Sequence, residues 1–266
     1  MLKEIFQYIS TPCQPYVKKL GFLTETIGME ARYQRCQTEW DSHYKQCQLA
    51  IVQAASKVVN KNTIVVMGAG SLRDIPLEQL SQDFIHVVLV DLVFLNRAKK
   101  IASSYQNISL IEADVSNSLE ELLTQSDCKK LIKYLVSNPP VLSDILPNIQ
   151  EVSCIISLNL ITQIPLIPVS RFLHKFNSDV VLVDELARLL IQQHLVLLES
   201  AADKKCLISD REICEYDVKE ALLDVVDPTW GIEFPQSELS WQWQSVPLYE
   251  SSQNTKKIHT VGVSFF

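Results

Sequence analysis

The chain has 266 residues, of which 47% are hydrophobic and 21% charged, and its formal net charge is −7. This composition is typical of a soluble globular protein with a sizeable core, and it excludes a largely disordered chain. The acidic balance gives no indication of a general affinity for nucleic acid or for anionic membranes.

The cysteines and the apolar runs indicate in which cellular compartment the protein is expected. The seven cysteines are scattered and include no Cys-x-x-Cys pair. We therefore expect reduced thiols rather than a disulfide framework or a zinc site. No uncharged apolar run reaches the roughly 18 residues that a membrane span needs, and Met1 to Tyr8 contain no apolar block long enough for a signal peptide. These features predict a cytoplasmic protein without a metal site.

Residues 1–60 are predicted to form a helical extension or cap, and residues 61–266 the main domain. The clearest N-terminal helix runs from Thr38 to Val59, where apolar residues recur at spacings of three and four. Such a stripe predicts a helix that packs against a sheet, and Thr38 is a candidate cap. His43 lies near the helix start and alternatively faces the ligand cleft, which makes it a candidate substrate contact.

The main functional motif begins at Thr63. The run Thr63–Met67 is short, apolar and β-branched, which predicts a buried strand, and Gly68-Ala69-Gly70 follows it directly. Glycines at this place let the backbone turn sharply and approach a ligand without an intervening Cβ. A helix that carries Leu72 to Phe84 is expected next, with its N-terminal amides aimed at the ligand.

A second apolar run, His86 to Val90, ends in Asp91, twenty-one residues after Gly70. An acid at the tip of the second strand is placed to bind both hydroxyls of a ribose. Strand, glycine turn, helix, strand and acid together predict a site for a nucleoside-containing cofactor.

Strands and helices alternate from Thr63 onward, which predicts a doubly wound, mainly parallel α/β sheet. Ligands of such sheets lie at the carboxyl ends of the strands, so Asn159 is expected in the same crevice as Gly68, Asp91 and Asp114. The last two strands are expected to pair antiparallel at the far edge of the sheet. The elements expected after Asp91 are helix 93–105, strand 108–114, helix 119–123, strand 152–157, helix 179–200, strand 205–210, helix 217–226, and strands 240–246 and 258–265.

Two further motifs are interpreted as structural. Asn138-Pro139-Pro140 matches a signature of methyltransferases that modify exocyclic amino groups, but that signature belongs at the end of the fourth strand. Here the next buried strand, 152–157, comes later, so the motif is expected to end a helix and to begin an extended linker. His194 has no second metal ligand at helical spacing and is expected to be a packed side chain.

From about residue 60 to residue 266, the chain resembles the class I S-adenosylmethionine-dependent methyltransferases. The resemblance rests on the glycine turn, Asp91, Ala113-Asp114, Ser157-Leu158-Asn159 and the terminal hairpin. It implies a seven-stranded sheet closed by an antiparallel C-terminal strand, with S-adenosyl-L-methionine as the cofactor. By position it implies that the glycine turn approaches the methionine part, that Asp91 binds the ribose and that Asp114 with Val115 flanks the adenine. The implied cofactor-binding residues are Met67, Gly68, Ala69, Gly70, Asp91, Leu92, Asp114, Val115 and Ser157.

The chain departs from the family pattern at two positions. Leu72 stands where a third glycine is usual, and Met67 stands where an acidic residue often precedes the first glycine. The second departure leaves open which group fixes the amino group of the methionine part.

The resemblance implies direct transfer of a methyl group from a sulfonium to a nucleophile. Because the sulfonium already activates the methyl group, the protein mainly has to align donor and acceptor and to exclude water. Asn159 is a candidate catalytic residue that either orients the acceptor or caps the following helix. Gln163 is a candidate substrate contact. The apolar stretch Asn159–Pro168 and the lack of a Lys/Arg cluster favour a small-molecule acceptor over nucleic acid.

Three other functions stay open. An NAD-dependent oxidoreductase shares the start of the pattern, but it normally has a third glycine where Arg73 stands, and its sheet ends in parallel strands. A polyamine synthase with a decarboxylated cofactor would need an acid in place of Asn159. A methyltransferase-like binding protein without activity would share every feature of the pattern.

Overall fold

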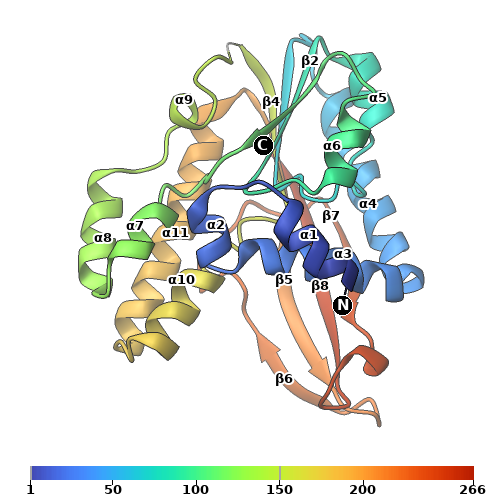
Figure 1. Ribbon diagram of the computed structural model, residues 1–266. Coiled ribbons are helices and arrows are strands. Elements are labelled where there is room, and N and C mark those ends of the chain that lie inside the picture. Colours follow the sequence, from blue (N-terminus) through green and yellow to red (C-terminus); the bar gives the residue numbers. More distant parts are fainter. Residues whose placement is uncertain (1, 150) are drawn as a thin grey trace.

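An eight-stranded sheet lies at the centre of the molecule, with helices on both of its faces (Figure 1). The computed structural model describes residues 2–149 and 151–266, and side chains from residue 4 onward. The strands follow the order β3-β2-β1-β4-β5-β8-β7, and β6 pairs with β5 off this path. The strands are β1 (Thr63–Met67), β2 (His86–Asp91), β3 (Ile108–Glu112), β4 (Val152–Leu158), β5 (Lys204–Tyr216), β6 (Leu222–Val226), β7 (Leu239–Val246) and β8 (Lys256–Phe265).

Strands β1 to β5 are parallel to one another, whereas β8 runs antiparallel to both of its neighbours, β5 and β7. This confirms the predicted fold class, a doubly wound and mainly parallel α/β sheet with an antiparallel C-terminal strand. The terminal hairpin of β7 and β8 forms the expected pair at the sheet edge. The sheet has one strand more than the seven expected, because β6 is added to β5.

Helices cover both faces of the sheet. The helices are α1 (Leu2–Ser10), α2 (Pro15–Lys19), α3 (Phe22–Arg35), α4 (Gln37–Ser56), α5 (Leu77–Asp83), α6 (Asn96–Ala102), α7 (Leu119–Thr124), α8 (Cys128–Ser137), α9 (Leu142–Ile145), α10 (Leu166–Ser170), π-helix η1 (Arg171–Lys175), α11 (Val180–Ala201) and 3₁₀-helix η2 (Leu248–Glu250).

Strand β1 shows how the sequence builds these two layers. Ile64 and Val66 belong to the core formed with α4, α5 and α6, whereas Val65 and Met67 belong to the core formed with α9 and α11. All four side chains are fully buried. A continuous β-branched run, rather than an alternating one, is what a strand buried on both faces requires.

The predicted helix 217–226 is wrong, because its second half is strand β6, which pairs antiparallel with β5. The reversal is made by an Asx turn in which the Asp217 carboxylate accepts hydrogen bonds from the backbone N–H groups of Lys219 and Ala221. Glu220 takes a left-handed φ of 64° in this turn. After the turn, the mostly apolar segment Leu222–Val226 ends in two β-branched valines, which favour a strand.

The helix expected directly after the glycine turn starts later than predicted. The chain makes turns from Gly70 to Pro76, and α5 begins only at Leu77. With seven residues, and with no residue lining the cavity described below, α5 does not aim its N-terminal amides at that cavity. By contrast, α8 ends at Ser137, immediately before Asn138-Pro139-Pro140, as expected.

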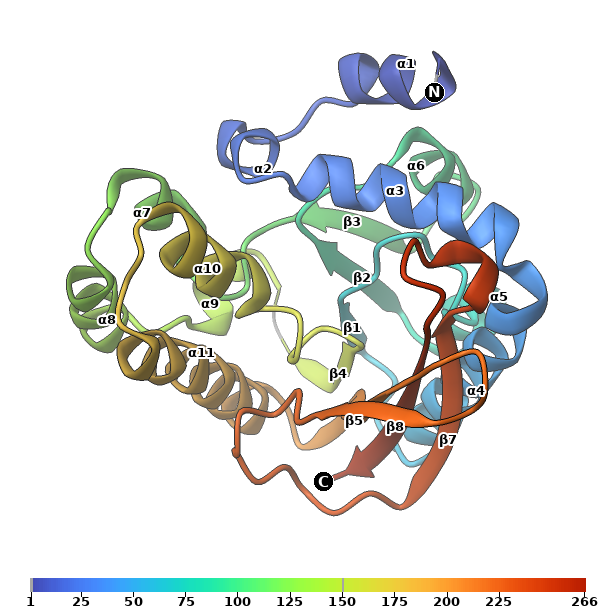
Figure 2. The same ribbon diagram turned by 90° about the horizontal axis from the view of Figure 1, so that it is seen from below.

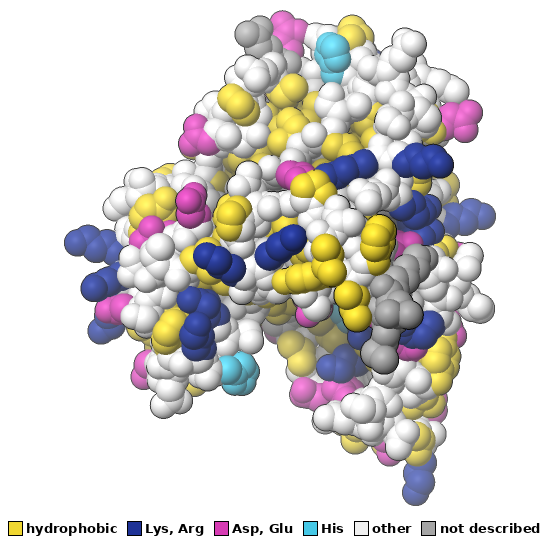
Figure 3. Space-filling model, viewed as in Figure 1, with side chains coloured by type: hydrophobic (Ala, Val, Ile, Leu, Met, Phe, Trp, Pro, Cys, Tyr) yellow, Lys and Arg dark blue, Asp and Glu magenta, His cyan; other side chains and the backbone are white. Residues whose placement is uncertain are grey.

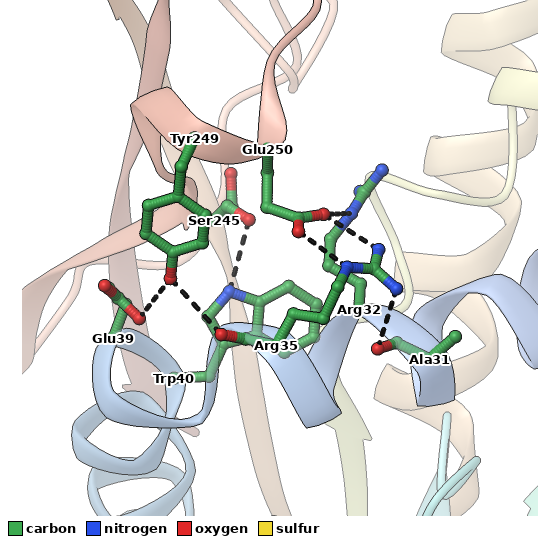
Figure 4. A network of polar contacts seen from close by, with 8 residues as sticks. All are labelled: Ala31, Arg32, Arg35, Glu39, Trp40, Ser245, Tyr249 and Glu250. Carbon is green, nitrogen blue, oxygen red and sulfur yellow. Dashed lines mark hydrogen bonds and ion pairs between the residues drawn. The ribbon is translucent and has the colours of Figure 1, made fainter.

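Side-chain hydrogen bonds connect the N-terminal helices α3 and α4 to β7 and η2 of the C-terminal hairpin (Figure 4). Arg35 on α3 donates two hydrogen bonds to the Glu250 carboxylate, at 2.6 and 2.8 Å. The Tyr249 hydroxyl donates to Glu39 on α4, and the buried Trp40 indole donates to the Ser245 carbonyl. Helix α4 itself packs on the sheet with its apolar stripe, as its spacing predicts.

Within the described part of the chain, no helix has the length and apolar character required to cross a membrane.

Candidate functional site

A single cavity of about 1120 Å³ opens at the carboxyl ends of the parallel strands. Its floor is formed by the ends of β1, β2 and β4 and the loop after β3, and its walls by α2, α3, α10 and η1. Seen from below, α3 passes the ends of β2 and β3 while α10 stands on the opposite side (Figure 2). The crevice that the sequence predicts at this edge is therefore present, and residues 1–60 contribute one of its walls.

The glycine turn requires its glycines. Gly68 has a φ of 86°, and a Cβ at this position would lie 2.3 Å from the backbone oxygen of Leu158. Only glycine fits there, because the turn after β1 touches the backbone at the end of β4. Gly70 has a φ of 32°. Both glycines line the cavity floor.

Leu72, which stands where a third glycine is usual, takes a left-handed backbone conformation. Its φ is 63°, and its side chain is only 4% exposed within the core under α4 and α5. A left-handed non-glycine residue costs on the order of 1 kcal/mol, which burial of a leucine side chain offsets. The turn therefore accommodates a leucine at this position.

The Asp91 carboxylate lies against the glycine turn. Its Oδ2 accepts a hydrogen bond from the Gly70 N–H at 2.7 Å, and its Oδ1 accepts one from the Leu92 N–H at 2.7 Å. Burial raises the pKa of Asp91 to about 6, although these backbone hydrogen bonds act in the opposite direction. The nearby Val93 N–H also favours the ionised carboxylate, and the lone pairs that remain can accept from a ligand hydroxyl.

The Asp114 carboxylate organises its own loop. Oδ1 accepts hydrogen bonds from the backbone N–H and the hydroxyl of Ser116, and Oδ2 accepts from the backbone N–H groups of Ser118 and Leu119. It thereby satisfies the start of α7, whose N-cap residue Ser118 makes no side-chain cap hydrogen bond. Asp114 and Val115 both line the cavity, with the carboxylate committed to holding the loop.

His43 is built into the cavity wall. Its side chain is 2% exposed, its ring stacks on Trp243 with centroids 4.1 Å apart, and its Nδ1 accepts a 3.0 Å hydrogen bond from the Trp241 indole. Burial lowers the pKa of His43 to about 4, so the ring is neutral. Nε2 lies 3.2 Å from the amide nitrogen of Asn159 and 3.7 Å from the sulfur of Cys47.

Asn159 lies at the cavity floor directly after β4. Its φ is 48°, its backbone N–H donates to the Ile208 carbonyl, and its own carbonyl accepts from the Gln163 side chain. Of the two roles expected for this residue, the helix cap is excluded, because α10 begins at Leu166 with Pro165 at its N-cap. The side-chain Oδ1 is buried and has no hydrogen-bond partner among the described residues. Gln163 lines the cavity beside it.

Three predicted cofactor residues have side chains that do not line the cavity. Met67 and Ala69 are fully buried in the two cores on either side of the sheet. Ser157 is also fully buried, and its hydroxyl lies 2.9 Å from Nε2 of His194 on α11. His194 is 1% exposed, which confirms that it is a packed side chain. The remaining predicted site residues, all of which line the cavity, are His43, Gly68, Gly70, Asp91, Leu92, Asp114, Val115, Asn159 and Gln163.

The structure adds Asp74, which the sequence pattern did not single out. This half-buried residue lies in the turn between Gly70 and α5 and lines the cavity. Burial, with a contribution from the neighbouring Asp91 charge, raises the pKa of Asp74 to about 7. Tyr44 on α4 also lines this part of the cavity, and burial together with Asp74 raises the pKa of its hydroxyl.

Four cations from three segments also line the cavity: Lys19, Arg97, and Arg171 with Lys175 on η1. In the part of the chain that the structure describes, none of them lies within 4.0 Å of a carboxylate. The Nε of Arg171 is buried and has no hydrogen-bond partner there. On the face shown in Figure 3, Lys and Arg side chains lie on both sides of an apolar strip over α1. No single stretch of sequence contains this grouping, which the fold assembles.

Among the described residues, no group of three His, Cys, Asp or Glu side chains is arranged to hold a metal ion.

Comparisons with known proteins give little further information. No family model matches the chain, and no curated protein is similar to it in sequence. Among solved structures, the chain is similar to the N-methyltransferase NodS from Bradyrhizobium japonicum WM9, in complex with S-adenosyl-L-homocysteine. The identity is 11%, the match covers 82% of this chain and 85% of that chain, and the TM-score is 0.35. Because the TM-score and the identity are this low, the sheet topology and the cavity are the better guides to function.

Proposed function

We propose that the protein is an S-adenosylmethionine-dependent methyltransferase that acts on a small molecule. One contact carries this proposal. At the cavity floor, the Gly70 N–H donates a 2.7 Å hydrogen bond to the Asp91 carboxylate, so the glycine turn and the acid lie side by side. The strand order with an antiparallel β8 between β5 and β7 supports the same family. A cavity of about 1120 Å³ leaves room for a cofactor and for an acceptor.

In this proposal the nucleoside part of the cofactor lies over the ends of β2 and β3. Asp91 accepts hydrogen bonds from the two ribose hydroxyls through the free lone pairs of its carboxylate. Leu92 and Val115 provide apolar contacts on the adenine, while Asp114 keeps the second loop in shape. The methionine part extends past Gly68 and Gly70 toward Asn159.

When bound, the cofactor supplies a methyl group on a positively charged sulfur. In the reaction, the acceptor's lone pair forms the new bond to the methyl carbon, and the bond from that carbon to sulfur breaks, which leaves a neutral thioether. The protein contributes alignment and exclusion of water rather than an obligatory base. Asn159 and Gln163 are placed to orient the acceptor by neutral hydrogen bonds.

The acceptor side of the cavity favours a partly apolar molecule with an acidic group. Leu160, Ile164 and Ile167 give that wall an apolar surface. Arg171, whose buried Nε lacks a partner within the described residues, lies on the same wall. A guanidinium in this state is suited to a carboxylate or a phosphate on a small molecule.

Two alternatives are less well supported. An NAD-dependent oxidoreductase is disfavoured because the sheet does not continue in parallel strands after β5. A polyamine synthase is disfavoured because Asn159, rather than an acid, follows β4. A methyltransferase-like binding protein shares the geometry and differs only in turnover.

The proposed function is tested by following a radiolabelled methyl group from S-adenosylmethionine into a panel of small acceptors. The panel contains matched acidic, neutral and basic molecules with similar apolar bodies. Transfer that favours the acidic members and is lost in Asp91→Ala is the expected result. Binding of the cofactor without transfer to any acceptor would favour the binding-protein alternative, and tight, salt-sensitive binding of RNA or DNA would contradict a small-molecule acceptor.

A further inference from the structure

In the family that the chain resembles, an acidic residue just before the glycine turn often binds the amino group of the cofactor's methionine part. This chain has an uncharged residue at that position. Met67 precedes the glycine turn, and its fully buried side chain packs against α11 and its neighbours rather than facing the cavity. An ammonium group at the methionine end of the cavity therefore needs another partner, because a buried cation without one is costly.

Asp74 stands at that end of the cavity. It lies four residues beyond Gly70 in the same turn, and Tyr44 and Asn159 line the cavity with it. The Asn159 amide is near enough to favour the ionised form of Asp74, and the Asp91 carboxylate is near enough to oppose it. Asp74 thus lies between the glycine turn and the end of β4, where the methionine part is proposed to run.

The Asp74 carboxylate has no cation of its own among the described residues. The adjacent Arg73 is turned away: its guanidinium binds the Glu30 carboxylate at 2.6 Å and stacks over the Tyr33 ring at 3.9 Å. Among the cavity cations, Arg97 donates to the Ser71 carbonyl in the same turn, and Arg171 and Lys175 belong to the wall formed by η1. Within the described residues none of them lies within 4.0 Å of a carboxylate, so neither Asp74 nor Asp91 is held in an ion pair.

We propose that Asp74 binds the α-amino group of the cofactor's methionine part and so replaces the acid that is missing at position 67. This inference rests on the proposed function, because it assigns a residue to the same cofactor. A charge-assisted hydrogen bond between an ammonium and a carboxylate fits a half-buried site that has an acid and no cation. The positively charged sulfonium of the cofactor would also lie near the carboxylates of Asp74 and Asp91 on the cavity floor, which attract it.

The test compares three ligands that differ only at the amino-acid end. S-adenosylhomocysteine carries the amino group, its deamino analogue lacks only that group, and 5′-methylthioadenosine lacks the whole amino-acid end. Calorimetry measures each ligand on the wild type and on Asp74→Asn. Glu25→Gln is the matched control, because Glu25 is an exposed acid that lines the same cavity from α3.

The wild type should prefer S-adenosylhomocysteine to its deamino analogue, and Asp74→Asn should lose that preference. Affinity for S-adenosylhomocysteine should fall about 10- to 100-fold in Asp74→Asn, as expected for a charged hydrogen bond, and stay unchanged in Glu25→Gln. The deamino analogue and 5′-methylthioadenosine should bind both proteins equally.

Two outcomes would overturn the assignment. In one, Asp74→Asn keeps the preference for the amino group. In the other, it binds all three ligands less well by the same factor while its melting temperature is unchanged, so that Asp74 acts on the pocket as a whole. A wild type that binds none of the three ligands would instead overturn the proposed function, which keeps the two failures distinct.

Discussion

The backbone N–H of Gly70 donates a 2.7 Å hydrogen bond to the Asp91 carboxylate, so the glycine turn after β1 and the acid at the end of β2 form one unit. The same carboxylate also accepts from the Leu92 N–H. The two halves of the predicted nucleoside site are thus fixed relative to each other by the protein alone. A change at Asp91 should therefore loosen the glycine turn as well as remove a contact to the cofactor.

Asp91→Ala should weaken S-adenosylmethionine binding roughly 30- to 150-fold, because a pair of charge-assisted hydrogen bonds contributes on the order of 2–3 kcal/mol. Titration calorimetry measures the loss, and circular dichroism checks that the protein stays folded. Glu78→Ala, at an exposed acid on α5, is the control and should bind as the wild type does. Equal affinity in Asp91→Ala and the wild type would remove the central assignment.

Cofactor affinity should rise as the pH increases from about 5.5 to 7.5. The pKa of Asp91 is about 6 and that of Asp74 about 7, so both acids ionise within this window. An α-amino group with a pKa of about 7.7–8.0 stays mostly protonated up to pH 7.5, so the change in affinity comes mainly from the two acids. Asp74→Asn should flatten the upper half of this pH profile. A profile that is flat in the wild type would show that neither acid titrates where the ligand binds.

The unliganded protein should show the opposite trend in stability. A carboxyl whose folded pKa lies above its unfolded value destabilises the fold progressively as the pH rises from about 4 to the folded pKa. Asp74→Asn should therefore stabilise the unliganded protein by about 1–2 kcal/mol at pH 8, after allowance for solvent screening, and have no effect near pH 3.5. Denaturant unfolding at the two pH values measures this difference, and a destabilised Asp74→Asn at pH 8 would contradict it.

Gly68→Ala should disrupt the glycine turn, whereas Gly28→Ala should not. A Cβ on Gly68 would lie 2.3 Å from a backbone oxygen, and its φ of 86° disfavours alanine, so several kcal/mol of stability should be lost. Gly28 lies in α3 with nothing within 4 Å of its Cβ position, so alanine there should stabilise the helix by about 0.5–1 kcal/mol. Thermal unfolding compares the two variants, and a stable Gly68→Ala would contradict the close contact.

Asn159→Gly should lower turnover more than it lowers cofactor affinity, which changes only through the loss of the amide beside Asp74. Glycine accepts the left-handed φ of 48°, so this variant removes the amide without adding backbone strain. Asn159→Ala adds that strain, on the order of 1 kcal/mol, and separates the two effects. Methyl-transfer kinetics beside calorimetry provide the readout. Unchanged turnover in Asn159→Gly would remove Asn159 from the acceptor site.

Removal of residues 1–60 should cost solubility or activity. Helix α4 covers one face of the sheet with side chains that are almost wholly buried, such as Trp40 and Ile51, and α3 lines the cavity. A chain that starts near Lys61 would expose that apolar face. Removal of residues 1–10 is the control, because it leaves α3 and α4 in place. A soluble, folded and fully active chain from Lys61 would show that these residues are not a cap.

Local signals were enough for the strands that build the site. The β-branched runs of β1 and β2, Gly68 and the acid at position 91 each have a short-range physical reason, so the sequence predicts their order and their shared edge. The helix predicted after Tyr216 was wrong. An Asx turn at Asp217 reverses the chain, and strand β6 forms because it pairs with β5, which local periodicity does not indicate. Asp74 gave no signal, since its role depends on the turn of Arg73 toward Glu30.

Side chains whose roles depend on distant partners could not be placed from the sequence. The sequence left His43 either on a packed helix face or facing the cleft, whereas its hydrogen bond comes from Trp241, almost 200 residues later. Ser157 was expected at the cofactor because it ends β4, but its hydroxyl points to His194 on α11. The cations at the cavity come from three separate segments, so no local charge cluster announces them.

Titration calorimetry of the wild-type protein with S-adenosylmethionine and, separately, with NAD tests the proposed cofactor most directly. We expect S-adenosylmethionine to bind at one site per chain and NAD not to bind. Binding of NAD with no heat from S-adenosylmethionine would contradict this expectation and would assign the glycine turn and Asp91 to a dinucleotide instead.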